Sequence, residues 1–443
     1  IGISPQVLPP IPQYYTMRIL FKQCFLFLLS HWKWTDATGY NDKRCFPYKE
    51  CPPIECASPA CPQKQHQALT PSLSSPVTTT GLCEKKCNSS SPRHRFATFN
   101  TSLNRKIRGY LIKDLRNGDA QAKNVAAIVQ IVRPEVLLLN EFDYDDDGEA
   151  LGIFMRDYLG VPQDGNDAIE YKYHFVSPVN TGVLSGWDYN EDGKVELPSD
   201  GYGFGNFPGQ YGMVLLSMHE IDTKRIRTFQ KFRWIDMPCA VLPFDQNNGM
   251  NYYDPVTCAN GESEMNTYRL SSKNHWDVPI TIDAQVYHVL AAHPTPPAFD
   301  DGDYCNGKID WNGRRNHDEI RFWSDYTDVN GASSDYIYDD DGTYGGIELP
   351  GDSKFVILGD HNADSVDGDS YEFPAKRFFT ENKMMNNCVV PESDGAVEYY
   401  ENDSRGCGIK KIRTSEFGLR VDYVLPSANI CIVDSGVFWP ERS

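Results

Sequence analysis

The chain has 443 residues, of which 40% are apolar and 12% aromatic, enough for a packed core. Acidic residues outnumber basic ones by 61 to 42, and the formal net charge is −19. This composition argues against a disordered chain and against a protein that holds nucleic acid by bulk positive charge. It leaves room for a nuclease that meets the phosphate through a divalent cation.

The first 40 residues predict a leader with a signal peptide that starts at Met17. Arg18 is followed by an apolar stretch that ends at Phe25–Leu29, although Lys22 and Gln23 interrupt it. The stretch is too short to span a bilayer, and no later segment reaches about 18 apolar residues. We therefore expect a secreted, extracellular protein without a membrane partner.

The 13 cysteines also favour an oxidising compartment. Six lie between Cys45 and Cys87, inside a Cys/Pro/Ser-rich segment (residues 41–92) in which Thr70–Gly81 has the composition of a linker. Six more are spread through the main domain, Cys24 lies in the predicted leader, and no C-x2-C pair with zinc-type partners accompanies them. Even numbers in both regions predict disulfides, whose pairing the sequence leaves open.

The main domain is predicted to cover residues 93–443. Phe96–Asn100 has the pattern of a strand, and Asp119–Val132 carries apolar residues at the spacing of an amphipathic helix that Pro134 stops. Val136–Leu139 is a continuous apolar run, which is typical of a buried strand. Similar runs follow along the chain, namely Met213–Ser217, Val286–Ala292, Phe355–Leu358 and Val421–Leu425. Buried strands that alternate with a few helices and long connections predict a layered α/β sandwich.

Several of these runs end in polar side chains that could meet at one metal–phosphate site. They are Asn100, Glu141, His293, Asp360, Asn362 and Asp422. Each alone has an ordinary explanation as a cap, a turn former or a hydrogen-bonding group. Their order along the chain carries more information than any one of them.

That order resembles the endonuclease/exonuclease/phosphatase superfamily, which includes deoxyribonuclease I. The resemblance covers about Arg95–Trp439, and some longer strings resemble a secreted, bacterial-type branch. It implies an α/β (α+β) fold, a four-layered β-sandwich flanked by helices. Its sharpest motifs are Ala97-Thr-Phe-Asn100, Leu139-Asn-Glu141, Tyr211-Gly-Met-Val-Leu-Leu-Ser217, Gly359-Asp-His-Asn362 and Arg420-Val-Asp-Tyr423.

The resemblance also implies roles for the metal ligands and for the phosphate contact. Asn100 and Glu141 would hold a divalent metal, Mg²⁺ or Mn²⁺, because hard cations take oxygen ligands and one carboxylate leaves room for water and phosphate. His293 would lie beside a phosphate oxygen, as a donor or a general acid. The implied reaction is in-line attack of water on phosphorus.

The remaining matched residues would act on the water and on a histidine. Asp360 and Asn362 would orient the attacking water and stabilise the transition state, and Asp422 would orient a catalytic histidine. Family members end with a strand that carries Ser-Asp-His, and no such motif follows Asp422 before Ser443. We therefore expect a C-terminally incomplete chain that lacks the last strand, binds metal weakly and hydrolyses poorly.

Two further segments contain candidate binding residues. Asp188, Asn190 and Asp192 have the spacing of the first ligands of an EF-hand loop, but Ser199 stands where that loop has a bidentate Glu. A structural Ca²⁺ site and an acidic surface turn remain equal alternatives. Two polar residues that follow the His293 strand, Arg315 and Asn316, could reach the substrate phosphate, or they could belong to a solvated loop or helix start.

Together these features predict a secreted, monomeric, divalent-metal-dependent phosphoric ester hydrolase. Its substrate would be nucleic acid (a phosphodiesterase or nuclease) or a small phosphate compound (a phosphatase). The alternative is a non-catalytic extracellular or matrix protein that kept the fold and binds Ca²⁺ through its acidic loops.

Overall fold

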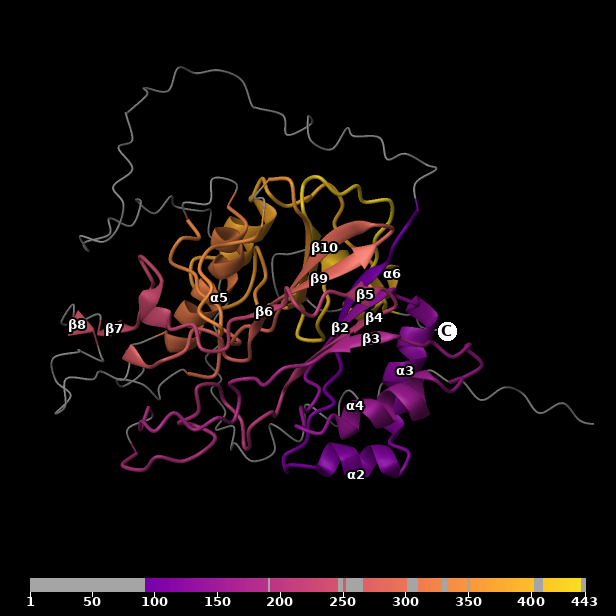
Figure 1. The fold of residues 1–443 in the computed structure, drawn as a ribbon, viewed down its shortest axis with the longest axis horizontal. Helices are drawn as coiled ribbons and strands as arrows, with labels where there is room; N and C mark the ends of the chain where they lie inside the picture. The colour runs from indigo at the N-terminus through magenta and orange to yellow at the C-terminus, as the bar shows by residue number, and fades with distance from the viewer. Residues whose placement is uncertain are drawn as a thin grey trace, which may run out of the picture.

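The computed structural model describes residues 92–189, 192–245, 250–251, 266–300, 310–328, 333–348, 351–401 and 409–439 (Figure 1). The predicted leader, nearly all of the segment 41–92 and Asn190 of the acidic loop lie outside these residues. Within the described ranges, no helix is long and apolar enough to cross a membrane.

The first sheet has the strand order β1-β2-β4-β3. Its strands are β1 (Phe96–Asn100), β2 (Val136–Asn140), β3 (Tyr173–Phe175) and β4 (Met213–Ser217). β1 and β2 are parallel, and β4 runs antiparallel to β2. The three strands predicted here are confirmed, with β2 one residue longer than expected.

The second sheet has the order β12-β11-β10-β9-β5, and a further short strand, β6, also pairs with β9. Its strands are β5 (Glu220–Ile221), β6 (Arg227–Thr228), β9 (His275–Ile282), β10 (Gln285–Ala292), β11 (Lys354–Asp360) and β12 (Asp422–Pro426). β10 and β11 are parallel, whereas β9 and β12 flank them antiparallel. A separate pair is formed by β7 (Phe244–Asp245) and β8 (Met250–Asn251).

Three helices and a π-helical turn cover the outer face of the first sheet. They are α2 (Tyr110–Arg116), α3 (Ala120–Val132), α4 (Glu149–Ile153) and the turn η2 (Phe154–Leu159). The side chain of Asp119 caps α3 by accepting from the Ala122 amide, 2.7 Å away, and the helix ends before Pro134, as predicted. Val125 and Val129 of α3 pack in the same cluster as Leu137 and Leu139 of β2.

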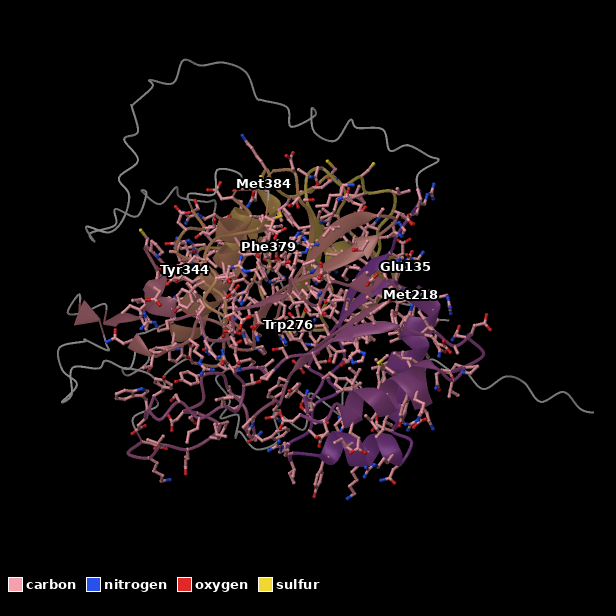
Figure 2. The ribbon with its side chains drawn as sticks, in the orientation of Figure 1. Glu135, Met218, Trp276, Tyr344, Phe379 and Met384 are labelled. Carbon is pink, nitrogen blue, oxygen red and sulfur yellow. The ribbon has the colours of Figure 1, made fainter. Side chains whose placement is uncertain are left out.

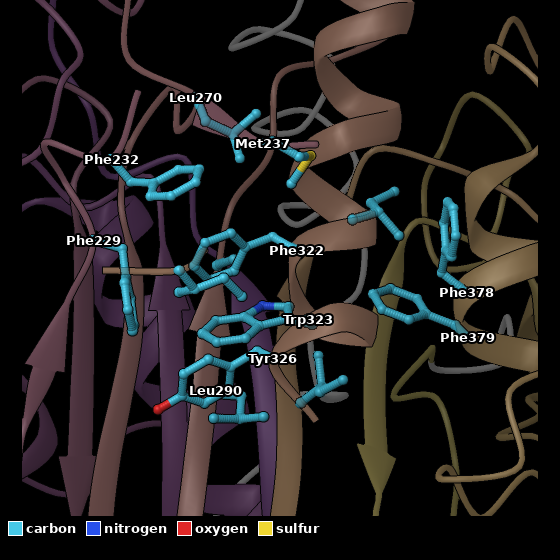
Figure 3. Packing of buried hydrophobic residues seen from close by; sticks show 14 of the residues in the cluster. Phe229, Phe232, Met237, Leu270, Leu290, Phe322, Trp323, Tyr326, Phe378 and Phe379 are labelled. Atoms are coloured by element: carbon cyan, nitrogen blue, oxygen red, sulfur yellow. The ribbon is translucent and has the colours of Figure 1, made fainter. Parts of the chain in front are cut away.

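The outer face of the second sheet is covered by α5 (Trp311–Tyr326) and the π-helical turn η5 (Ala375–Thr380). Figure 3 shows Phe322, Trp323 and Tyr326 of α5 directed at a layer that contains Leu290 of β10. The remaining helical elements are short: η3 (Trp234–Asp236), α6 (Asp394–Tyr399) and η6 (Lys410–Ile412).

A third cluster lies between the two sheets, where Leu138 of β2 and Leu215 of β4 pack with Trp276, Val289 and Val356 of the second sheet. Trp276 lies near the middle of the molecule in Figure 2. β2 is therefore buried on both faces, which explains its unbroken apolar run. Helices, sheet, sheet and helices form four layers, with α2–α4 on one side and α5 on the other (Figure 1), and the predicted α/β fold is confirmed.

Candidate active site

The parallel strands of both sheets are followed by, or end in, polar residues that lie at one end of the sandwich. Asn100 is the last residue of β1, and its amide Nδ2 donates to Glu141 Oε1 (3.1 Å) and to Asp360 Oδ2 (2.9 Å). Glu141 directly follows β2, and Asp360 ends β11 in the other sheet. Asn100 thus joins the two carboxylates across the sheet–sheet interface.

Two residues that the sequence did not single out complete the surroundings of Glu141. Asn104 Nδ2 donates to Glu141 Oε2 (2.9 Å), and Ser102 Oγ donates to the same oxygen (3.3 Å). The Ser102 amide also donates to Asn100 Oδ1 (3.1 Å), which fixes the amide orientation that faces the carboxylates. Ser102 and Glu141 both have left-handed backbone conformations, with φ of 49° and 59°. Such conformations are costly for residues with a side chain and concentrate at functional sites.

The Gly359–Asn362 turn presents a second set of polar groups. The Asn362 amide donates to Asp360 Oδ1 (3.0 Å), and Asn362 Nδ2 donates to the Pro294 carbonyl (3.1 Å). His293 follows β10, and its Nε2 lies 3.9 Å from Asp360 Oδ2. Glycine is required at 359 because a Cβ there would lie 2.0 Å from the backbone oxygen of Ala292. This close approach of β10 and β11 brings His293 and Asp360 together.

Asp422, the first residue of β12, lies beside Asp360 as its partner in the strand register. Burial raises the pKa of Asp360 to about 6, with a further contribution from the charge of Glu141. Burial and the charge of Asp360 raise the pKa of Asp422 well above its ordinary value. Among the described residues, Asp422 Oδ1 is buried without a hydrogen-bond partner. A buried group of carboxylates with unused oxygen acceptors fits a hard divalent cation.

Lys273 is the third group that sequence reasoning missed. It lies in the segment before β9, only 7% exposed, and burial lowers the pKa of its ammonium against the attraction of Glu319, Glu141 and Asp360. The pKa of His293 lies well below its ordinary value because the ring is buried and because Lys273 is near. Both effects favour the neutral form of the imidazole. No motif in the sequence around Lys273 indicates this position.

Arg315 and Asn316 lie on α5 and face the protein interior. The Arg315 guanidinium donates to the carbonyls of Leu270, Tyr202 and Arg269 and to the Tyr268 hydroxyl, and the residue is 3% exposed. Asn316 Nδ2 donates to the carbonyls of Thr295 (2.7 Å) and His361 (2.9 Å). The Asn316 bonds hold the loops that carry His293 and Asn362, whereas the Arg315 bonds hold the segment Tyr268–Leu270. Contact with substrate stays a prediction.

In the acidic loop, the Asp188 carboxylate accepts from the amides of Asp192 (3.2 Å) and Gly193 (2.8 Å). These bonds form a turn stabilised by its own side chain. Because Asn190 lies outside the described residues, the Ca²⁺ site remains a prediction.

The model of the Endonuclease/Exonuclease/phosphatase family matches residues 97–443. A search of curated proteins gave no match. Among solved structures, the chain is similar to an endonuclease/exonuclease/phosphatase protein from Beutenbergia cavernae, with 14% identity and a TM-score of 0.40. The match covers 75% of this chain and 64% of that protein.

It is also similar to a β-hairpin deletion mutant of beta toxin from Staphylococcus aureus (12% identity, TM-score 0.36, 79% and 92% coverage). Sphingomyelinase C from Streptomyces griseocarneus shows 13% identity, a TM-score of 0.34, and 76% and 84% coverage. The family match spans all six residues that the motifs had singled out, from Asn100 to Asp422. The chain belongs to the endonuclease/exonuclease/phosphatase family, most of whose members are hydrolytic phosphoesterases.

Proposed function

We propose that the protein is a divalent-metal-dependent phosphoric ester hydrolase that catalyses in-line attack of water on phosphorus. The observation that carries this proposal is the hydrogen-bonded unit of Asn100, Glu141 and Asp360, with His293 3.9 Å from Asp360. It gathers side chains from both sheets at one end of the sandwich. Such convergence is costly in buried charge and is typical of a catalytic site.

The donor set supports a site for Mg²⁺ or Mn²⁺. Glu141 offers a carboxylate, which already accepts hydrogen bonds from Ser102 and Asn104 that fix its position. Asn100 would offer its amide oxygen after a turn of the side-chain amide, because its Nδ2 faces the carboxylates in this structure. A bound divalent ion supplies positive charge for the phosphoryl oxygens, which carry the growing negative charge of the transition state.

The other residues position the reactants. The neutral His293 can donate a hydrogen bond to a phosphoryl oxygen without adding a full charge. Asp360 and Asn362, locked together by the 3.0 Å bond from the Asn362 amide, orient the attacking water. Asp422 would orient a catalytic imidazole through its Oδ1, which is buried without a hydrogen-bond partner among the described residues. The Lys273 amine, which lies near Glu141 and Asp360, would donate a hydrogen bond to a phosphoryl oxygen.

We further propose a secreted protein with disulfides. The hydrogen bond from Asn386 Nδ2 to the Ile430 carbonyl (2.7 Å) supports a link between Cys388 and Cys431, because it holds their segments together. The net charge of −19 favours a small phosphoester over a polynucleotide as substrate, since phosphates of a long chain would be repelled.

The test is hydrolysis of bis-p-nitrophenyl phosphate, p-nitrophenyl phosphate, DNA and RNA by the purified full-length protein, including any sequence that follows Ser443, with Mg²⁺ or Mn²⁺ and with EDTA. We expect metal-dependent turnover, which Glu141→Gln lowers by about a hundredfold or more because the amide cannot replace the ligand charge. Glu170→Gln is the matched control, because it makes the same substitution at an exposed glutamate. Equal turnover of Glu141→Gln and wild type would refute the site. A wild-type protein inert on all four substrates would favour the Ca²⁺-binding alternative.

A further inference from the structure

A cluster of two histidines and a glutamate lies at the end of the sandwich opposite the active site. His94 precedes β1, Glu135 precedes β2 and His219 follows β4, whereas Asn100 and Glu141 follow the other ends of β1 and β2. Six residue steps lead from His94 to Asn100, which corresponds to about 20 Å in extended chain. Figure 2 shows Glu135 beside Met218, where β2 begins and β4 ends.

The ligand atoms of this cluster already point at one another. Glu135 Oε2 lies 2.9 Å from His94 Nδ1 and 2.6 Å from His219 Nε2, and all the ligand atoms lie within 4.8 Å of one another. His219 is held in place by its own backbone, because its amide donates to Ser217 Oγ (3.0 Å) and its carbonyl accepts from the same hydroxyl (2.8 Å). The three side chains are 17–27% exposed, so an ion has access from solvent.

The second nitrogen of His94 faces another carboxylate. His94 Nε2 lies 3.1 Å from Oδ2 of Asp283, which belongs to the β9–β10 turn of the other sheet. An imidazole between two carboxylates satisfies both only if each nitrogen carries a proton or if a metal ion replaces one proton. The Glu135 Oε2 atom lies between two imidazole nitrogens, which is the arrangement that a cation shared by the three side chains would need.

We propose that His94 Nδ1, His219 Nε2 and Glu135 Oε2 bind a zinc ion, with water as the fourth ligand. Two imidazoles and one carboxylate form a ligand set typical of Zn²⁺ and unlike the all-oxygen sets of Mg²⁺ and Ca²⁺. In a tetrahedral zinc site with bonds of about 2.0–2.1 Å, ligand atoms are about 3.3 Å apart. The nitrogen–oxygen separations in the cluster need to widen by only about half an ångström.

Asp283 completes the site without touching the ion. It accepts from the Nε2–H of His94, which fixes the tautomer that leaves Nδ1 free to bind the metal. Because Asp283 belongs to the second sheet and the three ligands flank strands of the first, the ion would tie the two sheets together. The inferred role is structural and separate from the catalytic centre.

The test is zinc binding by the full chain, stripped with EDTA and then dialysed against Zn²⁺ in the presence of excess Mg²⁺. We expect wild type to retain about one zinc per chain in this site, with nitrogen and oxygen ligands at about 2.0–2.1 Å by X-ray absorption. Zinc should also raise the melting temperature. His219→Gln should lose both the retained zinc and the thermal shift.

Three further variants separate this site from other zinc binding. Asp283→Asn, at a carboxylate 61% exposed, should preserve the fold and weaken zinc binding about tenfold. His174→Gln, at an exposed histidine on β3, should leave zinc binding unchanged, and so should Glu141→Gln in the active site. The proposal fails if wild type retains no zinc, if His219→Gln retains as much as wild type, or if sulfur ligands at about 2.3 Å account for the ion.

Discussion

Asn100 and Asp360 are 260 positions apart in the sequence, yet the Asn100 amide donates to the Asp360 carboxylate at 2.9 Å. The two residues end β1 and β11, strands of different sheets that pack face to face. The site therefore exists only when the two sheets are correctly packed. Its precision depends on the buried layer of Leu138, Trp276 and Val289 between the sheets, which contains no catalytic group.

Replacing Lys273 with methionine should lower turnover without lowering the free energy of unfolding. The pKa of Lys273 is lowered, because the cost of burying the ammonium exceeds the attraction of the nearby carboxylates. Lys273→Met should therefore leave the free energy of unfolding within about 1 kcal/mol of wild type, or raise it. Turnover should fall by about 10²–10³, as when a preorganised donor is removed from an active site. Urea unfolding and phosphoester hydrolysis measure the two effects.

Lys231→Met provides the control, because Lys231 is exposed and lies away from the site. Lys231→Met should change neither the free energy of unfolding nor the turnover. If Lys273→Met lost about 3 kcal/mol of stability, Lys273 would instead be a structural counter-ion whose removal leaves buried carboxylates uncompensated.

The strands and their polar ends could be predicted because both properties are local. A run such as Val136–Leu139 is apolar throughout since each face of β2 meets a packed layer, and the residue that follows such a strand is exposed to the site. The six motif residues could thus be selected from sequence order. Asn100, Glu141, His293 and Asp360 are indeed gathered by hydrogen bonds or close approach.

The missed residues depend on loop paths that no local pattern encodes. Lys273 is one lysine in a polar run before β9, and only its burial between Glu141 and Glu319 distinguishes it. Arg315 is the opposite case, a residue that the sequence suggests for phosphate binding. In the structure its guanidinium donates to backbone carbonyls instead. The partners of such residues come from distant segments, so their roles follow from tertiary structure alone.

Replacing Gly359 with alanine tests whether the approach of β10 to β11 sets the site geometry. The new Cβ would lie 2.0 Å from the Ala292 backbone oxygen, so the strands must separate between His293 and Asp360. We expect a loss of about 1–3 kcal/mol in the free energy of unfolding together with a drop in turnover. Gly152→Ala is the matched control: a Cβ there meets nothing within 4 Å, and alanine in α4 should add about 0.5–1 kcal/mol. Equal stability of the two variants would contradict the close-approach argument.

The burial of His275 predicts that part of the loss of stability in acid arises outside the active site. Its ring is buried, hydrogen-bonded to Ser271 Oγ (2.6 Å) and to the Glu319 carbonyl (2.9 Å), and packed 4.8 Å from the Phe322 ring. Burial lowers the pKa of His275 from 6.5 to about 4. Protonation of this ring is therefore less favourable in the folded state than in the unfolded chain. The stability that neutral His275 contributes is fully present above pH 6.5 and is lost as the pH falls toward 4.

Each pH unit within that window should cost about 1.4 kcal/mol through His275. In His275→Gln this contribution is absent, so the unfolding free energy should fall less steeply between pH 6.5 and 4 than in wild type, even if the variant is less stable at pH 7. Urea unfolding at half-unit pH intervals measures the slope difference. His174→Gln should keep the wild-type slope, because that histidine is exposed in the folded state, as it is in the unfolded chain. A His275→Gln slope that matches wild type would show that the ring is protonated within the fold.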